Sequence, residues 1–379
     1  MTAFDQQLLD DPTALLAADR GDLLRGLATA GAQVRRALET AGDFGVDRLA
    51  GEARPRAVLV APDPNAPYLS WLLTALARAE APVLDWRDAG LPRWAGPADV
   101  LLVASADGRH PRLAELVAQA DRRGLVIAVA APAGSPVAAA ASRHPIADLN
   151  NLAGVAQRAV WWSLAAPMLL TLDALGLART QELLPQLADR LDEVAESERP
   201  DSDAYVGPAK VLAAELAESV PVFAGIGPAG TAAAHRVAGA VQLIGGATAM
   251  SASLPDDVAR IGSLLEFAGG SGGVEADFFA DRVEDVTVKP RLVIIGDDDD
   301  YGVGRPDETA DALAGRRAAD ALAGLARTRS IGVSRILVPE APPLVRFGCA
   351  TATADFAAAY LALARGVDPS APRLGELDH

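Results

Sequence analysis

The chain has 379 residues, of which 50% are hydrophobic, 22% are charged and only 4% are aromatic. That composition supplies a sizeable core, excludes a wholly disordered chain and, at roughly 100–200 residues per domain, predicts two or three domains. The formal net charge is −16. Because so acidic a surface repels phosphate backbones and anionic lipid, we expect neither a nucleic-acid partner nor a membrane partner.

Short aliphatic runs alternate with helical patterns through the first half of the chain. Residues 19–41 carry apolar side chains at helical spacing and predict a first helix. Uniformly apolar runs follow at 57–61, 99–104 and 125–130, and helices are predicted at 69–79, 113–123, 136–142, 155–177 and 181–197. This alternation is typical of βαβ units, and strands without polar alternation are typical of a parallel sheet buried on both faces. We therefore expect a first domain over residues 1–195.

The polar, proline-containing segment 196–208 marks the predicted domain boundary, and the same rhythm resumes after it. Strands are predicted at 220–224, 291–295 and 334–338, and helices at 232–246, 307–327 and 351–365. We therefore expect a second domain over residues 205–379. Both domains are predicted to be α/β, each a three-layer α/β/α sandwich around a parallel sheet.

Turns that follow strands are the candidate sites, because open parallel sheets bind ligands at the carboxyl ends of their strands. The turn after residues 101–104 brings Ser105, Arg109 and His110 to the start of a predicted helix, where a hydroxyl and cationic side chains can bind an anion. An ordinary helix-capping turn is the more common alternative. The turn at residues 62–65 has no glycine and two prolines that lack N–H groups, so it is poorly suited to hold phosphate.

The turn Gly225–Gly230, followed by Thr231, matches the G-x-G-x-x-G dinucleotide fingerprint after a strand and before a helix. The fingerprint also expects an acid about 20 residues further on, at the end of the next strand. The nearest acids, Asp256 and Asp257, do not follow a clear strand, and Pro228 removes one N–H from the turn. A tight strand–helix turn is therefore favoured, with a dinucleotide-binding enzyme at Gly225–Gly230 as an alternative.

Metal ligands are scarce in this sequence. Four consecutive aspartates at 297–300 follow a predicted strand, but successive side chains diverge, so a solvated loop is favoured over a Mg²⁺ site. The four histidines lie far apart and no pair has metal-ligand spacing. We expect no metal and no cofactor.

The single cysteine, Cys349, excludes an intrachain disulfide and a thiolate metal cluster and favours a reducing cytoplasm. Residues 1–11 are polar and acidic, so we expect no signal peptide. The apolar stretch 159–175 contains Pro167 and Asp173 and is interpreted as a buried helix. It also holds Trp161 and Trp162, which are either core residues or a surface for a partner subunit.

Several short motifs resemble the bifunctional phosphoglucose/phosphomannose isomerases, which are built from two sugar-isomerase (SIS) domains. The motifs are Gly207-Pro208-Ala209-Lys210, the glycine turn, Ser253-Leu254-Pro255-Asp256, Tyr360-Leu361-Ala362 with Gly366-Val367-Asp368-Pro369, and Arg158 with Ala159, Leu164 and Pro167. The resemblance implies two SIS domains and a homodimer. It also implies isomerisation of a hexose 6-phosphate by a carboxylate base and a histidine, with hydroxyls and an arginine on the phosphate.

The sequence departs from that family where the chemistry is done. Only Ser105 remains as a clear hydroxyl in the first-domain loop, no acid occurs between Arg236 and Ser253, and residues 257–261 contain no histidine. We therefore expect a cytoplasmic protein that binds a phosphosugar or sugar nucleotide, with isomerase chemistry lost or altered. The expected ligand-binding residues are Ser105, Arg109, Arg158, Gly225, Gly227 and Thr231. The alternative is an active, divergent isomerase with Asp256 or Asp257 as its base.

Overall fold

The computed structural model describes residues 4–51, 53–63, 66–77, 81–149, 155–203, 205, 207–268, 289–297, 310–338 and 340–370. The chain divides into two compact units. The N-terminal unit consists of Asp19–Ser197 with Ser370–His379, and the C-terminal unit consists of Met1–Ala18 with Glu198–Pro369.

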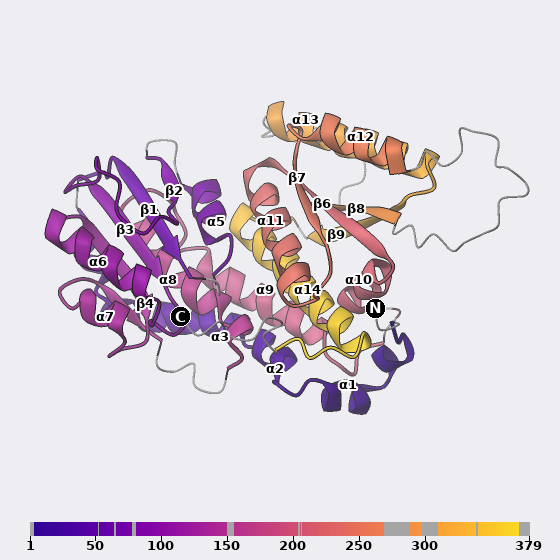
Figure 1. Cartoon of the computed structure of the whole chain (residues 1–379), viewed down its shortest axis with the longest axis horizontal. Coiled ribbons are helices and arrows are strands. Elements are labelled where there is room, and N and C mark those ends of the chain that lie inside the picture. Colours follow the sequence, from indigo (N-terminus) through magenta and orange to yellow (C-terminus); the bar gives the residue numbers. More distant parts are fainter. Residues whose placement is uncertain are drawn as a thin grey trace, which may run out of the picture. The chain divides into compact units, whose positions relative to one another are not determined.

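The N-terminal unit is built on a five-stranded parallel sheet in the order β2-β1-β3-β4-β5 (Figure 1). Its strands are β1 (Ala57–Pro62), β2 (Val83–Asp85), β3 (Asp99–Ala104), β4 (Val126–Ala131) and β5 (Ile146–Asp148). β1 and β3 are buried along their whole length, as largely apolar strands covered on both faces must be; the charged exception, Asp99 at the start of β3, pairs with Arg56. Because β2 lies on one side of β1 and β3 on the other, the strand order reverses between β1 and β3. Ligands bind at this switch point in open α/β sheets.

Helices cover both faces of this sheet. α6 (Pro111–Arg123) and α7 (Pro136–Ala140) pack on one face, where Leu113 and Leu116 join an apolar cluster with the strands. α5 (Leu69–Leu76) and α8 (Trp161–Ala174) pack on the other. The remaining helices are α2 (Leu23–Leu27), α3 (Ala30–Glu39), α4 (Ala41–Phe44), α9 (Leu184–Ser197) and the short 3₁₀ helices η2 (Val46–Leu49) and η4 (Gln157–Ala159).

The C-terminal unit repeats the design with a four-stranded parallel sheet in the order β7-β6-β8-β9 (Figure 1). Its strands are β6 (Ser219–Ile226), β7 (Met250–Leu254), β8 (Lys289–Asp297) and β9 (Gly332–Val338). One face carries α12 (Val258–Ala268) and α13 (Ala310–Thr328), and the other α10 (Pro208–Leu216), α11 (Gly227–Leu243) and α14 (Pro343–Ala364). The N-terminal η1 (Gln7–Asp10) and α1 (Pro12–Ala18) complete the unit. The predicted pair of α/β sandwiches with parallel sheets is confirmed.

The first eighteen residues belong to the C-terminal unit, although the sequence places them with the first predicted domain. The Asp5 N–H donates to the Ala364 carbonyl at the end of α14, 2.7 Å away. A hydrogen bond between residues so distant along the chain has no local sequence signal. The division into domains at 1–195 and 205–379 stays a prediction.

Two apolar helices are core elements. α14, which carries Cys349, is the one helix among the described residues that is long and apolar enough to cross a membrane, and 94% of its apolar window is buried inside the protein. In α8, Trp161 and Trp162 are 3% and 4% exposed, and their rings meet edge to face with centroids 4.9 Å apart. Trp161 Nε1 donates to the Pro67 carbonyl at 3.1 Å. Of the two interpretations of these tryptophans, the core one is confirmed.

Candidate functional site

The loop of residues 105–110 after β3, called the β3 loop, lies at the switch point of the first sheet. Its backbone N–H groups are largely taken by side chains of the protein itself. The Ala106 N–H donates to Asp63 Oδ2 at 2.6 Å, the Gly108 N–H to Ser105 Oγ at 3.1 Å, and the Arg109 N–H to Asp107 Oδ1 at 2.9 Å. Two of these three acceptors are carboxylates. An external anion at this loop therefore has to be held mainly by side chains.

Packing against the next loop holds the β3 loop in place. Gly108 adopts a left-handed φ of +66°, and a Cβ built on it would lie 2.1 Å from Ser135 Oγ. The Gly108 carbonyl accepts the Val137 N–H at 3.0 Å, at the start of α7. Only glycine fits this position. The Nδ1 atom of His110 is buried and has no hydrogen-bond partner among the residues that the structure describes.

The two arginines expected to bind phosphate lie on different elements of the N-terminal unit. Arg109 is exposed on the β3 loop, and Arg158 is half-buried on η4, which packs against α2. Three residues after Arg158, Trp161 contacts the Pro67 carbonyl, so α8 begins beside the segment that joins β1 to α5. That Arg109 and Arg158 meet on one ligand stays a prediction.

The glycine turn of the C-terminal unit is explained by backbone packing. β6 runs to Ile226 and α11 begins at Gly227, so no loop separates them. A Cβ on Gly225 would lie 2.0 Å from the Gly230 carbonyl oxygen, and Gly227 has a left-handed φ of +68°. Both positions therefore require glycine whether or not a ligand binds. This geometry favours the tight-turn interpretation; Thr231 is half-buried on the first turn of α11.

Of the two fallback bases, Asp257 is held in place and Asp256 is exposed after β7. Asp257 Oδ2 accepts the Ser253 N–H at 2.8 Å, and its Oδ1 accepts from Arg260 Nε at 3.0 Å. The hydrogen bond from Arg260 lowers the pKa of Asp257, and the Ser253 N–H lowers it further, outweighing partial burial. A carboxylate with a lowered pKa is a weak general base near neutral pH.

A histidine that the sequence could not orient lies close to Asp257. His235 on α11 is half-buried, and its Nδ1 is 2.8 Å from Ser251 Oγ on β7. Burial lowers the pKa of His235, although the charge of Asp257 opposes that shift. The Arg260 guanidinium donates to the Ser251 carbonyl at 3.1 Å. These contacts tie α11 and α12 to the edge strand β7, and only the folded structure shows which face of α11 carries His235.

No group of three or more His, Cys, Asp or Glu side chains that could hold a metal ion occurs within the described parts of the chain. Of the aspartate run at 297–300, the backbone of Asp297 ends β8, and the other three lie outside the described residues.

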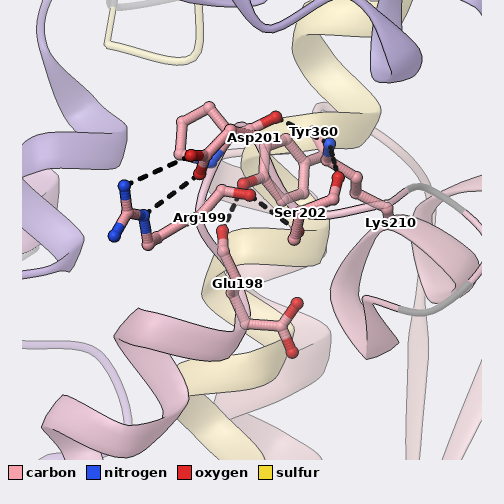
Figure 2. Close-up of polar contacts among 7 residues, drawn as sticks. Glu198, Arg199, Asp201, Ser202, Lys210 and Tyr360 are labelled. Carbon is pink, nitrogen blue, oxygen red and sulfur yellow. Dashed lines mark hydrogen bonds and ion pairs between the residues drawn. The ribbon is translucent and has the colours of Figure 1, made fainter.

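The motif residues Lys210 and Tyr360 form a buried polar network instead of a ligand site (Figure 2). Lys210 is 1% exposed, and its Nζ donates to the carbonyls of Leu9, Pro200 and Ser202 at 2.7, 2.8 and 2.7 Å. An ammonium group has three N–H donors, and all three are used. The Tyr360 hydroxyl donates to the Glu198 carbonyl, and Nζ lies 5.7 Å from the centre of the Tyr360 ring.

The Glu198 carboxyl is buried at the start of α10. It is 1% exposed, and its Oε2 accepts the Ala209 N–H at 3.0 Å. Burial raises the pKa of Glu198 to about 7, although the Ala209 N–H and the charge of Lys210 act in the opposite direction. This acid therefore titrates near neutral pH.

Replacing Glu198 with glutamine is expected to change how stability depends on pH. The pKa of Glu198 is raised in the folded protein. The contribution of this carboxyl to the stability of the folded state is therefore complete below about pH 4.5 and is lost as the pH rises through about 7. Glu198→Gln mimics the protonated acid at every pH. The free energy of unfolding of the variant, relative to that of the wild type, should therefore rise by on the order of 2–3 kcal/mol as the pH goes from 5 to 8. Urea unfolding followed by circular dichroism at several pH values measures this. Glu193→Gln, at an exposed ion pair on α9, is the control, and parallel pH profiles for wild type and Glu198→Gln would contradict the assignment.

Comparison with known proteins agrees with this architecture. Residues 205–373 match the family model described as the bacterial phospho-glucose isomerase C-terminal SIS domain. A search of curated proteins found no significant match. Among solved structures, a protein assigned as a phosphosugar isomerase from Silicibacter pomeroyi is similar at a TM-score of 0.57 and 17% identity, over 92% of this chain and 99% of the other.

Two further structures have the same fold. A glucose-6-phosphate isomerase-like protein from Thermus thermophilus is similar at a TM-score of 0.50 and 16% identity, over 87% of this chain and 91% of the other. The C-terminal domain of glucosamine-fructose-6-phosphate aminotransferase from Francisella tularensis is similar at a TM-score of 0.53 and 9% identity, over 93% and 96%.

The two parallel α/β sandwiches and these matches define an SIS-domain protein with a phosphosugar-isomerase-like fold. Residues 205–373 are similar to the C-terminal SIS domain of the bacterial phosphoglucose isomerases, from which this sequence diverges. The resemblance seen in the sequence motifs is confirmed.

Proposed function

We propose that this protein binds a sugar phosphate or a sugar nucleotide and that it has lost the ordinary aldose–ketose isomerase chemistry. The observation that carries the proposal is the state of Asp257. Both of its carboxylate oxygens are engaged, by the Ser253 N–H and by Arg260, and its pKa is lowered. Moving a proton between adjacent carbons needs a base that is accessible and has a pKa near the working pH.

The other groups that could act as a base fit the role no better. α11 carries no acidic residue between Gly227 and Leu243. Asp256 is exposed, so no surrounding structure positions it against a substrate. His235 is hydrogen-bonded to Ser251 from the middle of α11, away from the helix start. These features favour a binding protein over the active isomerase with Asp256 or Asp257 as base.

The phosphate group is expected to lie between the β3 loop and η4. Ser105 and the backbone of this loop are already engaged, so the guanidinium groups of Arg109 and Arg158 are the donors of choice. A planar guanidinium holds phosphate through two parallel hydrogen bonds. Gly225, Gly227 and Thr231, at the start of α11, are a second candidate set, because backbone N–H groups are exposed at the start of a helix. The homodimer that the family resemblance implies and the cytoplasmic location that the single cysteine favours stay predictions.

Replacing Arg158 with alanine is expected to weaken sugar-phosphate binding by roughly 1.5–3 kcal/mol, the scale of a hydrogen bond to a charged group. Isothermal titration calorimetry with glucose 6-phosphate, fructose 6-phosphate and mannose 6-phosphate measures the loss. Arg36→Ala, an exposed arginine on α3 that pairs with Glu39, is the matched control and should leave affinity unchanged. If both Arg158→Ala and Arg109→Ala bind as tightly as the wild type, the phosphate site lies elsewhere.

A further inference from the structure

We infer that Asp63 acts as an internal anion, whose carboxylate occupies the backbone anion position of the β3 loop, at the Ala106 N–H, and keeps an external phosphate off that N–H. This inference rests on the proposed function, because phosphate is the anion of interest at this loop only if the protein binds a phosphorylated ligand. It names the residue that decides how strongly this loop can hold such a group.

The position of Asp63 is defined by the sheet. It directly follows β1, and its own N–H donates to the Ala104 carbonyl at the end of β3, 2.9 Å away. Its carbonyl accepts the Ala66 N–H at 3.1 Å. Asp63 is therefore anchored between β1 and β3, where the strand order reverses and where open α/β sheets bind their ligands. Its side chain is held in the protein, because the residue is only 5% exposed.

The carboxylate of Asp63 makes the contact that a bound phosphate would make. Its Oδ2 accepts the Ala106 N–H at 2.6 Å, in the loop that leads from β3 into the thirteen-residue helix α6. Backbone N–H groups in this setting, between a strand and a helix start, are common donors to phosphate oxygens. One N–H cannot serve both anions fully, and a phosphate beside a buried carboxylate is repelled strongly because the local dielectric is low. Asp63 thus closes the Ala106 N–H to an external anion, which at this loop has to be held by side chains such as Arg109.

A second aspartate of this sheet makes the same kind of hydrogen bond to a loop N–H. Asp148 ends β5, and its Oδ1 accepts the Ala133 N–H at 2.8 Å, in the loop that follows the neighbouring strand β4. In both places a carboxylate at the end of one strand takes an N–H from the loop after the adjacent strand. Of the two, Asp63 lies at the switch point, and it therefore controls the position where a ligand is expected.

The test compares inorganic phosphate binding by the wild type, Asp63→Ala and Asp63→Asn, using isothermal titration calorimetry at constant pH and ionic strength. Asp63→Ala frees the Ala106 N–H and should bind phosphate at least about tenfold more tightly than the wild type, the factor that corresponds to one hydrogen bond to a charged group. Asp63→Asn has the same shape and keeps an oxygen on that N–H. It should fold normally and bind with intermediate affinity, because only the charge repulsion is removed.

Two controls locate the effect. Asp47→Ala removes one exposed negative charge from η2 and should bind phosphate like the wild type. The backbone amide resonance of Ala106 should shift on phosphate addition in Asp63→Ala and stay in place in the wild type. The inference is overturned if both Asp63 variants match the wild type, or if affinity rises while the Ala106 resonance does not move.

The experiments distinguish a failure of the role given to Asp63 from a failure of the proposed function. A wild type that binds no sugar phosphate, together with an Asp63→Ala variant that gains phosphate binding, refutes the proposed function and supports the role of Asp63. Sugar-phosphate binding by the wild type without any gain in the Asp63 variants refutes only the role of Asp63.

Discussion

Replacing Lys210 with methionine should destabilise the C-terminal unit by at least about 3 kcal/mol, because three buried carbonyls lose a charged hydrogen-bond donor. Methionine matches the length of the lysine stem but has no donor. Three carbonyls, those of Leu9, Pro200 and Ser202, would lose their hydrogen bonds inside the protein. Each buried polar group left without a partner costs about 1–3 kcal/mol.

The positions of the tryptophans allow the unfolding of the two units to be followed separately. All five tryptophans lie in the N-terminal unit, so tryptophan fluorescence reports on that unit, whereas circular dichroism reports on both. In urea unfolding, Lys210→Met should shift the circular dichroism transition and leave the fluorescence transition in place. A fluorescence transition that shifts equally would show that the two units unfold as one.

Two neighbouring substitutions calibrate the effect of Lys210→Met. Tyr360→Phe removes only the hydrogen bond to the Glu198 carbonyl and should destabilise by about 1–3 kcal/mol. Arg199→Ala removes an ion pair with Asp201 in which both side chains are more than half exposed, and it should change stability by less than about 1 kcal/mol. Equal effects of Lys210→Met and Arg199→Ala would contradict the structural role given to the lysine.

Isomerase activity is expected to be at least about 10³-fold below that of an ordinary enzyme, because a positioned general base and acid typically contribute about 10²–10⁴-fold. The purified protein is assayed with glucose 6-phosphate and mannose 6-phosphate, and formation of fructose 6-phosphate is followed. The physical reason is the engaged, weakly basic Asp257 and the lack of any acid on α11.

A turnover number in the usual enzyme range of about 1–10³ per second would refute this prediction. Asp256→Asn and Asp257→Asn are then the deciding variants. Loss of activity in one of them would establish the divergent isomerase with that aspartate as its base. Retained activity in both would place the base elsewhere in the chain.

The apolar inner strands could be predicted because their signal is local, whereas the edge strands β5 and β7 were not predicted, and Asp256 does follow a strand. A strand buried on both faces of a parallel sheet has to be mainly apolar, and β1, β3 and β4 show that in sequence as runs of valine, leucine, isoleucine and alanine, apart from Asp99 at the start of β3 and Pro62 at the end of β1. The glycine turn could be placed for a similar reason, since Gly225 and Gly227 meet a backbone requirement that the short motif itself records.

The site could be predicted only in part, because its decisive contacts join residues that are distant in sequence. From the sequence, the turn that contains Asp63 is unsuited to phosphate because its two prolines lack N–H groups. In the folded protein, the more important fact is that Asp63 takes an N–H from the β3 loop, 43 residues away. The orientation of His235 likewise depends on which face of α11 meets β7.

Composition, periodicity and short motifs are enough to predict the α/β class, the parallel sheets and the family resemblance. What the motif residues do becomes visible in the folded protein alone. Lys210 and Tyr360 hold backbone carbonyls from separate segments of the chain, and residues 1–18 join the C-terminal unit. The physical reason is that a buried polar group must find a partner wherever the fold supplies one, and no pattern along the chain encodes which distant carbonyl or N–H that will be.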